Sequence, residues 1–203
     1  MLRYLLTACI LTLLAAYNNA RTAKAPFERV DPTPSSQFGN IDTLAKFGIF
    51  ISKFKLMSYP LTASTTCYEP DSSTSLPLDM DNDSMFINYV GPAATVGLLP
   101  DTSDFYAVIY CTAAECYLPQ LAVFSKRGKL LSSQAISFGC GSDVGYFCTE
   151  VLTVNSLRDI TLVHNEIQYE VDKRGRVTKH IQTKTNNVYK YSITKNGLIT
   201  VNQ

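Results

Sequence analysis

The sequence lacks the short motifs by which most enzymes are recognised. It has only two histidines, His164 and His180, and no Trp. It contains no G-x-S-x-G segment that would carry a nucleophilic serine, no C-x-x-C redox pair, and no glycine-rich loop with the spacing and Lys of a phosphate-binding loop. These absences argue against serine hydrolases, thioredoxin-like oxidoreductases and P-loop proteins. We therefore assign no catalytic residue and expect no cofactor.

Beyond its first residues, the chain has no apolar run near the ~20 residues that span a bilayer. Residues 1–20 read MLRYLLTACILTLLAAYNNA, in which a basic residue precedes a mostly apolar run from Leu5 to Ala16. This pattern is typical of a helical signal peptide, and we expect cleavage near Ala16 or Ala20. A lipoprotein would need a cysteine where this chain has Tyr17, so a lipid anchor is the second choice and the only membrane attachment we expect.

The charge balance argues against a surface that binds nucleic acid or anionic membranes strongly. The chain has 18 Lys and Arg against 17 Asp and Glu. Without residues 1–20, which hold one Arg and no acid, the count is 17 against 17. A neutral chain is not expected to bind nucleic acid. Residues 21–40 are rich in Pro, Ser, Thr and charge and predict a flexible lead-in, and residues 41–203 are long enough for a single β-rich domain.

The first segment of this domain, residues 41–58, has an ambiguous pattern. Four of its apolar residues fit one face of a helix, whereas Phe47, Ile49 and Ile51 alternate as in a strand. The segment is short and contains Gly48, so we predict a strand. The next strand is expected at residues 85–90, which read MFINYV.

A repeated pattern predicts the architecture of the remaining chain. Gly128, Gly175 and Gly197 each end a run of an apolar residue, a polar residue, Lys, and Arg or Asn. Gly in this place suits the left-handed residue that closes a three-residue hairpin loop with a bulge. The repeat predicts a predominantly all-β fold, an antiparallel hairpin meander closing into a barrel-like or curved sheet.

Five cysteines follow the signal peptide. Cys111 and Cys116 are separated by four residues, and Cys140 and Cys148 by seven. Structural zinc ligands usually stand two to four residues apart, and the seven-residue gap breaks this pattern, so we favour disulfides over a metal. The simplest pairing is Cys111–Cys116 and Cys140–Cys148, although crossed pairings remain open. Cys67 is then the odd thiol, either free and buried or taking the place of one of the four.

Five segments of the domain follow one another in the order LLPDTSDFYAVIYC, YLPQLAVFSKRGKLLSS, FGCGSDVGYFCTE, LTVNSLRDITLV and YKYSITKNGLITV. The succession resembles a broad set of small exported proteins and lipoproteins of Bacteroidetes-type bacteria, over roughly residues 75–203. The resemblance implies export and a β-rich fold, and it implies no catalytic residue.

One acidic stretch could attract calcium. Asp79, Asp81 and Asp83 alternate, and their oxygens could surround Ca²⁺. An EF-hand loop would continue with Gly at its sixth place and Glu at its twelfth, where this chain has Ser84 and Val90. We interpret the stretch as a solvated acidic loop, with calcium as the weaker alternative, and assign no metal site.

The remaining catalytic hypothesis uses the odd thiol. Cys67 could act as a nucleophile with His164 or His180 as its base, or two carboxylates could converge as in a glycoside hydrolase. No motif supports either arrangement. We therefore predict an exported, non-enzymatic β-domain that binds a protein or ligand in the periplasm, at the outer-membrane periphery or outside the cell. A hydrolase of either kind is the alternative.

Overall fold

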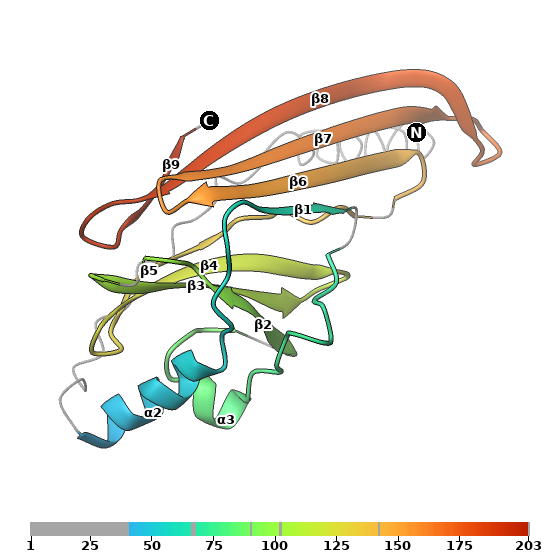
Figure 1. Ribbon diagram of the computed structural model, residues 1–203. Helices are drawn as coiled ribbons and strands as arrows, with labels where there is room; N and C mark the ends of the chain where they lie inside the picture. The colour runs from blue at the N-terminus through green and yellow to red at the C-terminus, as the bar shows by residue number, and fades with distance from the viewer. Residues whose placement is uncertain (1–40, 66–67, 90, 102, 142, 203) are drawn as a thin grey trace, which may run out of the picture. The chain divides into compact units, whose positions relative to one another are not determined.

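Antiparallel strands make up most of the structure, a computed structural model shown in Figure 1. The structure describes residues 41–203 except 66–67, 90, 102, 142 and 203. The described residues lie within one of two compact units of the chain, Asp31–Gln203. The expected signal peptide and lead-in, residues 1–40, lie outside the described residues, and so does Cys67.

The strands form two antiparallel sheets, one with the order β2-β3-β4-β5 and one with the order β1-β6-β7-β8-β9. The prediction of a predominantly all-β fold built from antiparallel hairpins is confirmed, and the described strands form two stacked sheets instead of a closed barrel. The strands are β1 (Leu61–Thr65), β2 (Ala93–Leu98), β3 (Phe105–Ala113), β4 (Tyr117–Ser125), β5 (Leu130–Ala135), β6 (Tyr146–Ser156), β7 (Asp159–Val171), β8 (Val177–Ile193) and β9 (Ile199–Asn202).

The main core lies between the two sheets. Alternate residues of β3 and β4 face alternate residues of β6, β7 and β8, because successive side chains of a strand point to opposite faces. Both sets are almost entirely inaccessible to solvent. They include Ile109, Leu121 and Val123 from the four-stranded sheet and Val154, Ile160, Leu162 and Ile193 from the five-stranded sheet.

Helices cover the other face of the four-stranded sheet, which makes β3 and β4 buried on both sides (Figure 1). The helices are α2 (Ile41–Ser52) and α3 (Met80–Asp83). The predicted strand within residues 41–58 is therefore wrong. Phe47 and Phe50 lie one turn apart on α2 and are buried against Phe124 of β4, with ring centroids 5.5 and 5.6 Å from it.

The expected strand at residues 85–90 is also wrong. The chain from Met85 to Ile87 forms the turn that follows α3, and Phe86 and Ile87 are buried with the phenylalanines of α2. The apolar residues of this segment are thus used for packing against a helix and not for pairing in a sheet.

No helix within the described residues is long and apolar enough to cross a membrane.

The three glycine turns are confirmed as hairpin loops. Gly128, Gly175 and Gly197 have φ angles of +82°, +76° and +76°. In each loop the glycine N–H donates to the carbonyl of the residue three positions earlier, and that residue's N–H donates to the carbonyl of the residue after the glycine. These bonds are those of a three-residue loop closed by a left-handed glycine, and they join β4 to β5, β7 to β8, and β8 to β9.

Candidate functional site

A disulfide closes the loop that leads into β6, as the spacing of its cysteines predicted. Cys140 and Cys148 are bonded, with their Cα atoms 5.2 Å apart. Cys148 lies near the start of β6 and is buried, so the bond attaches the loop to the five-stranded sheet. Gly139 and Gly145, both with positive φ, lie within or beside this loop, where left-handed backbone suits glycine.

The predicted Cys111–Cys116 disulfide is wrong. Cys111 is a free, buried thiol whose Sγ donates to the carbonyl oxygen of Ala94, 3.5 Å away. Cys111 pairs with Pro119 within the β3–β4 ladder, whereas Cys116 lies in the turn beyond the last pair, so the two sulfurs do not meet. Cys116 is disulfide-bonded, but not to Cys111. Burial raises the pKa of the Cys111 thiol to about 11.

Three ionisable side chains meet beside the Cys140–Cys148 disulfide. His164 of β7 lies between two carboxylates, with its Nδ1 2.8 Å from Oε1 of Glu150 and its Nε2 3.1 Å from Oε1 of Glu166. Glu150 pairs directly with His164 across the β6–β7 ladder, and Glu166 pairs with Cys148. The Sγ of Cys148 lies 3.8 and 3.9 Å from the two ring nitrogens.

Further hydrogen bonds fix both carboxylates. The Ser137 hydroxyl and the Phe138 backbone N–H donate to Glu150, the second over 2.8 Å. The Tyr146 hydroxyl donates to Oε1 of Glu166 over 2.8 Å. Glu150 is 7 % exposed, so these donors replace the water that its charge would otherwise bind.

The contacts favour the charged forms of both partners. Burial alone would raise the pKa of Glu150. The hydrogen bonds from His164, Ser137 and Phe138 outweigh burial and lower this pKa below its usual value. The hydrogen bond to Glu150 raises the pKa of His164, aided by Glu166 and opposed by burial. Both shifts favour a buried ion pair between His164 and Glu150.

The two carboxylates fix the orientation of the His164 ring. Both ring nitrogens are engaged with carboxylates, so the imidazole has no free nitrogen to accept a proton from a nucleophile. His180 lies apart on β8, with a 76 % exposed side chain and Nδ1 3.7 Å from Glu170. Glu150 and Glu166 do converge, but the His164 ring occupies the space between their carboxylates.

The acidic stretch Asp79, Asp81 and Asp83 lies at the short helix α3: Asp79 precedes the helix, and Asp81 and Asp83 belong to it. Asp79 is the N-cap of α3 and accepts the backbone N–H of Asp81 over 2.9 Å. Asp83 is only 2 % exposed and accepts two bonds from Nζ of Lys53, over 2.6 and 2.9 Å. Asp79 and Asp83 therefore bind the protein's own donors, and within the described residues no group of three or more His, Cys, Asp or Glu could hold a metal ion.

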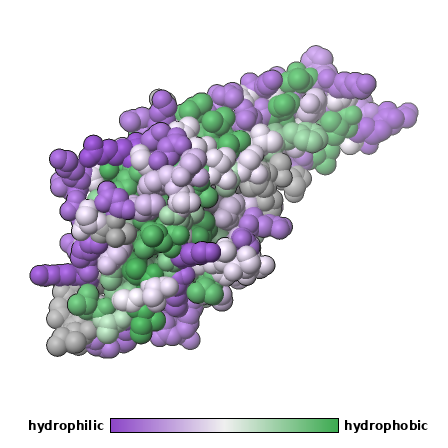
Figure 2. All heavy atoms as spheres, viewed as in Figure 1, coloured by the Kyte–Doolittle hydropathy of each residue, from purple (hydrophilic) through white to green (hydrophobic). Residues whose placement is uncertain are grey.

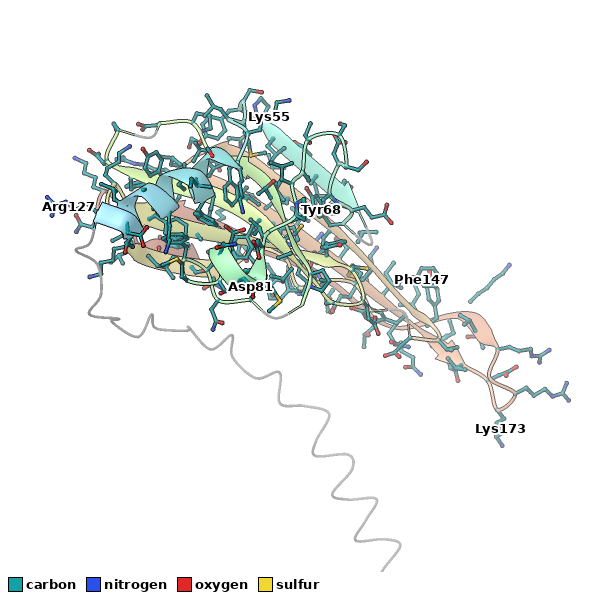
Figure 3. All side chains as sticks on the ribbon, turned by 90° about the horizontal axis from the view of Figure 1, so that it is seen from below. Lys55, Tyr68, Asp81, Arg127, Phe147 and Lys173 are labelled. Atoms are coloured by element: carbon teal, nitrogen blue, oxygen red, sulfur yellow. A yellow bond between two sulfur atoms is a disulfide. The ribbon has the colours of Figure 1, made fainter. Side chains whose placement is uncertain are left out.

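The five-stranded sheet extends past its partner sheet as an arm (Figures 1 and 3). We define the arm as residues 146–149 of β6, 165–171 of β7, the turn 172–176 and residues 177–187 of β8. Figure 3 shows Lys173 at its tip and Phe147 closer to the body. The arm contributes nothing to the core between the sheets.

Apolar and basic side chains are both exposed on the arm, where Figure 2 shows hydrophobic atoms interrupted by hydrophilic ones. Phe147, Val177 and Ile181 are 60 %, 46 % and 45 % exposed, and the ring of Phe147 lies edge-on to Tyr169. The arm holds five Lys and Arg against three Asp and Glu, a net charge of +2, whereas the whole chain has +1. It combines apolar contact area with positive charge.

The arm also presents an unpaired strand edge. Within the described residues, β9 pairs with β8 only from Lys190 to Ile193, and on its other side β8 pairs with β7 along the arm. The outer edge of residues 177–187 therefore pairs with no other described strand. Unpaired backbone groups on such an edge can accept an additional strand.

Sequence reasoning missed the residues that surround His164. Glu150 and Glu166 belong to no motif, because their meeting depends on the β6–β7 register. The available signal was alternation: Cys148, Glu150 and Leu152 occupy alternate places in a strand, so an acid lies on the face that also carries a cysteine and an apolar residue. A buried acid needs a partner, and His164 was a candidate.

Comparison with protein families, with curated proteins and with solved structures found no match for this chain. The resemblance to exported Bacteroidetes-type proteins stays a prediction.

Proposed function

We propose that this protein is an exported, non-enzymatic binding module and that the arm is the surface that takes its partner. The observation that carries this proposal is the arm itself: part of three strands extends beyond the body, adds nothing to the core, and exposes Phe147, Val177 and Ile181. Exposed large apolar side chains grouped on one surface are typical of interaction sites.

The partner we propose is an extended, acidic segment of another protein that pairs with β8. Main-chain hydrogen bonds to residues 177–187 would supply affinity, and side-chain contacts would supply specificity. Lys179 and Lys184 lie on this strand and are exposed. Their charges repel a second copy of the same edge and attract glutamate or aspartate, so charge complementarity favours an acidic strand.

Two observations support export. The Cys140–Cys148 disulfide is of a kind that persists in oxidising compartments such as the periplasm or the cell exterior. Residues 1–20 have the pattern of a signal peptide. We expect mass spectrometry of protein made in its native host to find a mature N-terminus shortly after Ala16 or Ala20; an intact Met1 on the bulk of the protein would contradict export by this signal.

Binding can be tested with two short peptides that differ only in charge. One alternates valine and glutamate, and the other alternates valine and lysine. We expect the acidic peptide to bind and to slow amide hydrogen exchange in residues 177–187, because added backbone hydrogen bonds protect the strand edge. We expect the basic peptide to bind at least about tenfold more weakly, a difference of ~1.4 kcal/mol.

A charge-reversed pair of variants supplies the control. Lys179→Glu with Lys184→Glu should reverse the preference between the two peptides, whereas Lys55→Glu with Lys129→Glu makes the same charge change on the body and should leave it unchanged. Equal binding of both peptides, no binding of either, or protection outside the arm would contradict the proposed partner. Turnover of an ester, glycoside or peptide by the purified protein would contradict the non-enzymatic function.

A further inference from the structure

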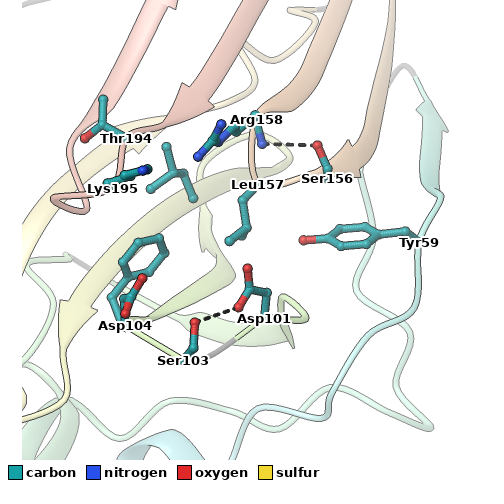
Figure 4. Close-up of a pocket in the computed structure, with 11 residues that line it drawn as sticks. Tyr59, Asp101, Ser103, Asp104, Ser156, Leu157, Arg158, Thr194 and Lys195 are labelled. Atoms are coloured by element: carbon teal, nitrogen blue, oxygen red, sulfur yellow. Dashed lines mark hydrogen bonds between the residues drawn. The ribbon is translucent and has the colours of Figure 1, made fainter.

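A pocket of about 320 Å³ opens where the two sheets end, at the end of β7 and β8 opposite the arm (Figure 4). Its walls come from the segment before β1, the β2–β3 loop, the β6–β7 turn and the β8–β9 turn. Its volume lies at the lower end of the range for small-molecule sites, ~300–1,000 Å³. Phe105, Leu157 and Ile193 supply apolar surface.

Opposite charges face each other across this pocket. Asp101 and Asp104 come from the β2–β3 loop, Arg158 from the β6–β7 turn and Lys195 from the β8–β9 turn. In Figure 4 the two carboxylates lie on one side and the two cationic side chains on the other. The side chains of Asp104, Arg158 and Lys195 form no salt bridge or hydrogen bond with any other described residue. Their charges are available to a ligand that spans the gap.

The Tyr59 hydroxyl is directed into the same space (Figure 4). It is buried and has no hydrogen-bond partner among the described residues. Burial, and after it the charge of Asp101, raises the pKa of Tyr59, so the hydroxyl keeps its proton and can donate. A buried polar group is normally hydrogen-bonded, so a hydroxyl that faces a pocket and has no protein partner is placed to bind a ligand atom.

We propose that this pocket binds a small zwitterion, a free amino acid or a dipeptide. The ammonium group would face Asp101 and Asp104, and the carboxylate would face Arg158 and Lys195. The Tyr59 hydroxyl would donate to a ligand oxygen, and the apolar surface would contact the carbon skeleton. The site lies at the far end of the sheet from the arm, so it stands independently of the partner proposed above.

NMR titration of the ¹⁵N-labelled protein tests this proposal with defined ligands. The zwitterions are L-leucine, L-glutamine and L-alanyl-L-alanine. For any that binds, the N-acetyl derivative removes the ammonium charge and the amide derivative removes the carboxylate charge. We expect saturable shifts around the pocket with at least one zwitterion, and binding at least about tenfold weaker for each of its derivatives, because each loses a charge-assisted hydrogen bond.

Tyr59→Phe and Tyr89→Phe form a matched pair. Both hydroxyls are buried without a partner among the described residues, but Tyr89 does not line this pocket. We expect Tyr59→Phe to weaken binding about fivefold or more with no loss of thermal stability, and Tyr89→Phe to leave binding unchanged. Asp104→Asn should weaken the zwitterion but not its N-acetyl derivative. Absence of saturable shifts with all three zwitterions, equal binding of the derivatives, or equal effects of the two tyrosine variants would overturn the proposal.

Discussion

Replacing Glu150 by Gln tests the buried ion pair at the root of the arm. The substitution keeps the shape of the side chain and its place opposite His164 but removes its negative charge. Glu150 accepts hydrogen bonds from His164, Ser137 and Phe138. The variant keeps one acceptor oxygen for His164 and Phe138, and its amide can donate to the Ser137 hydroxyl, so the main change is the loss of the charge.

The structure sets the size of the expected loss. Hydrogen bonds to a charged group contribute ~1.5–3 kcal/mol and neutral ones ~0.5–1.5 kcal/mol, so three weakened bonds cost about 3 kcal/mol. Burying a neutral amide instead of a carboxylate returns part of this cost. We expect Glu150→Gln to lower the free energy of unfolding by about 2 kcal/mol near pH 5.5.

The loss depends on pH because both partners have shifted pKa values. The raised pKa of His164 gives stability that is complete below its unfolded pKa and is lost as the pH rises through the higher folded pKa. The lowered pKa of Glu150 gives stability that is present above its unfolded pKa and is lost as the pH falls through the lower folded pKa. The pair therefore stabilises most between about pH 4.5 and 6.5, and the variant should lose less near pH 8.5.

Urea unfolding with the Cys140–Cys148 disulfide intact measures the free energy of unfolding at pH 5.5 and at pH 8.5. Glu69→Gln is the control, because Glu69 is exposed and the substitution makes the same chemical change. If Glu150→Gln and Glu69→Gln give equal free energies of unfolding at both pH values, the ion pair does not stabilise the fold and the reasoning is refuted.

Three further outcomes test the fold. Gly197→Ala should destabilise more than Gly175→Ala in thermal unfolding. Both φ angles are +76°, but the added Cβ lies 2.5 Å from a side-chain carbon of β5 at position 197, whereas it has no atom within 4 Å at position 175. Equal losses of stability would show that only the backbone angle matters. Cys111 should resist iodoacetamide until the protein unfolds, because its pKa is raised to about 11; fast labelling in the native state would contradict its burial. Reducing Cys140–Cys148 should lower the free energy of unfolding by about 2–3 kcal/mol, the loop-entropy value for so short a loop, and an unchanged urea midpoint would contradict it.

Local features of the fold followed from the sequence because their cause is local. A left-handed residue that closes a short hairpin loop favours glycine wherever it occurs, so Gly128, Gly175 and Gly197 marked the turns correctly. The disulfide between Cys140 and Cys148 was also predictable, since both cysteines belong to one loop. The all-β class followed from the turns.

The failures share a different cause. Residues 41–52 fit both a helix and a strand, and contact with Phe124 on a distant strand decided for the helix. Cys111 was matched with the nearest cysteine along the chain, but the β3–β4 register directs its sulfur into the interior.

By itself the sequence determined the β class, the glycine turns and one disulfide, because these depend on neighbours along the chain. Only the tertiary structure decided what lies around His164, since Glu150 reaches it across a pair of strands. The same holds for the pocket at Tyr59, whose walls come from four separate segments. Such sites depend on strand register and sheet packing, and these are settled by the burial of side chains far apart in the sequence.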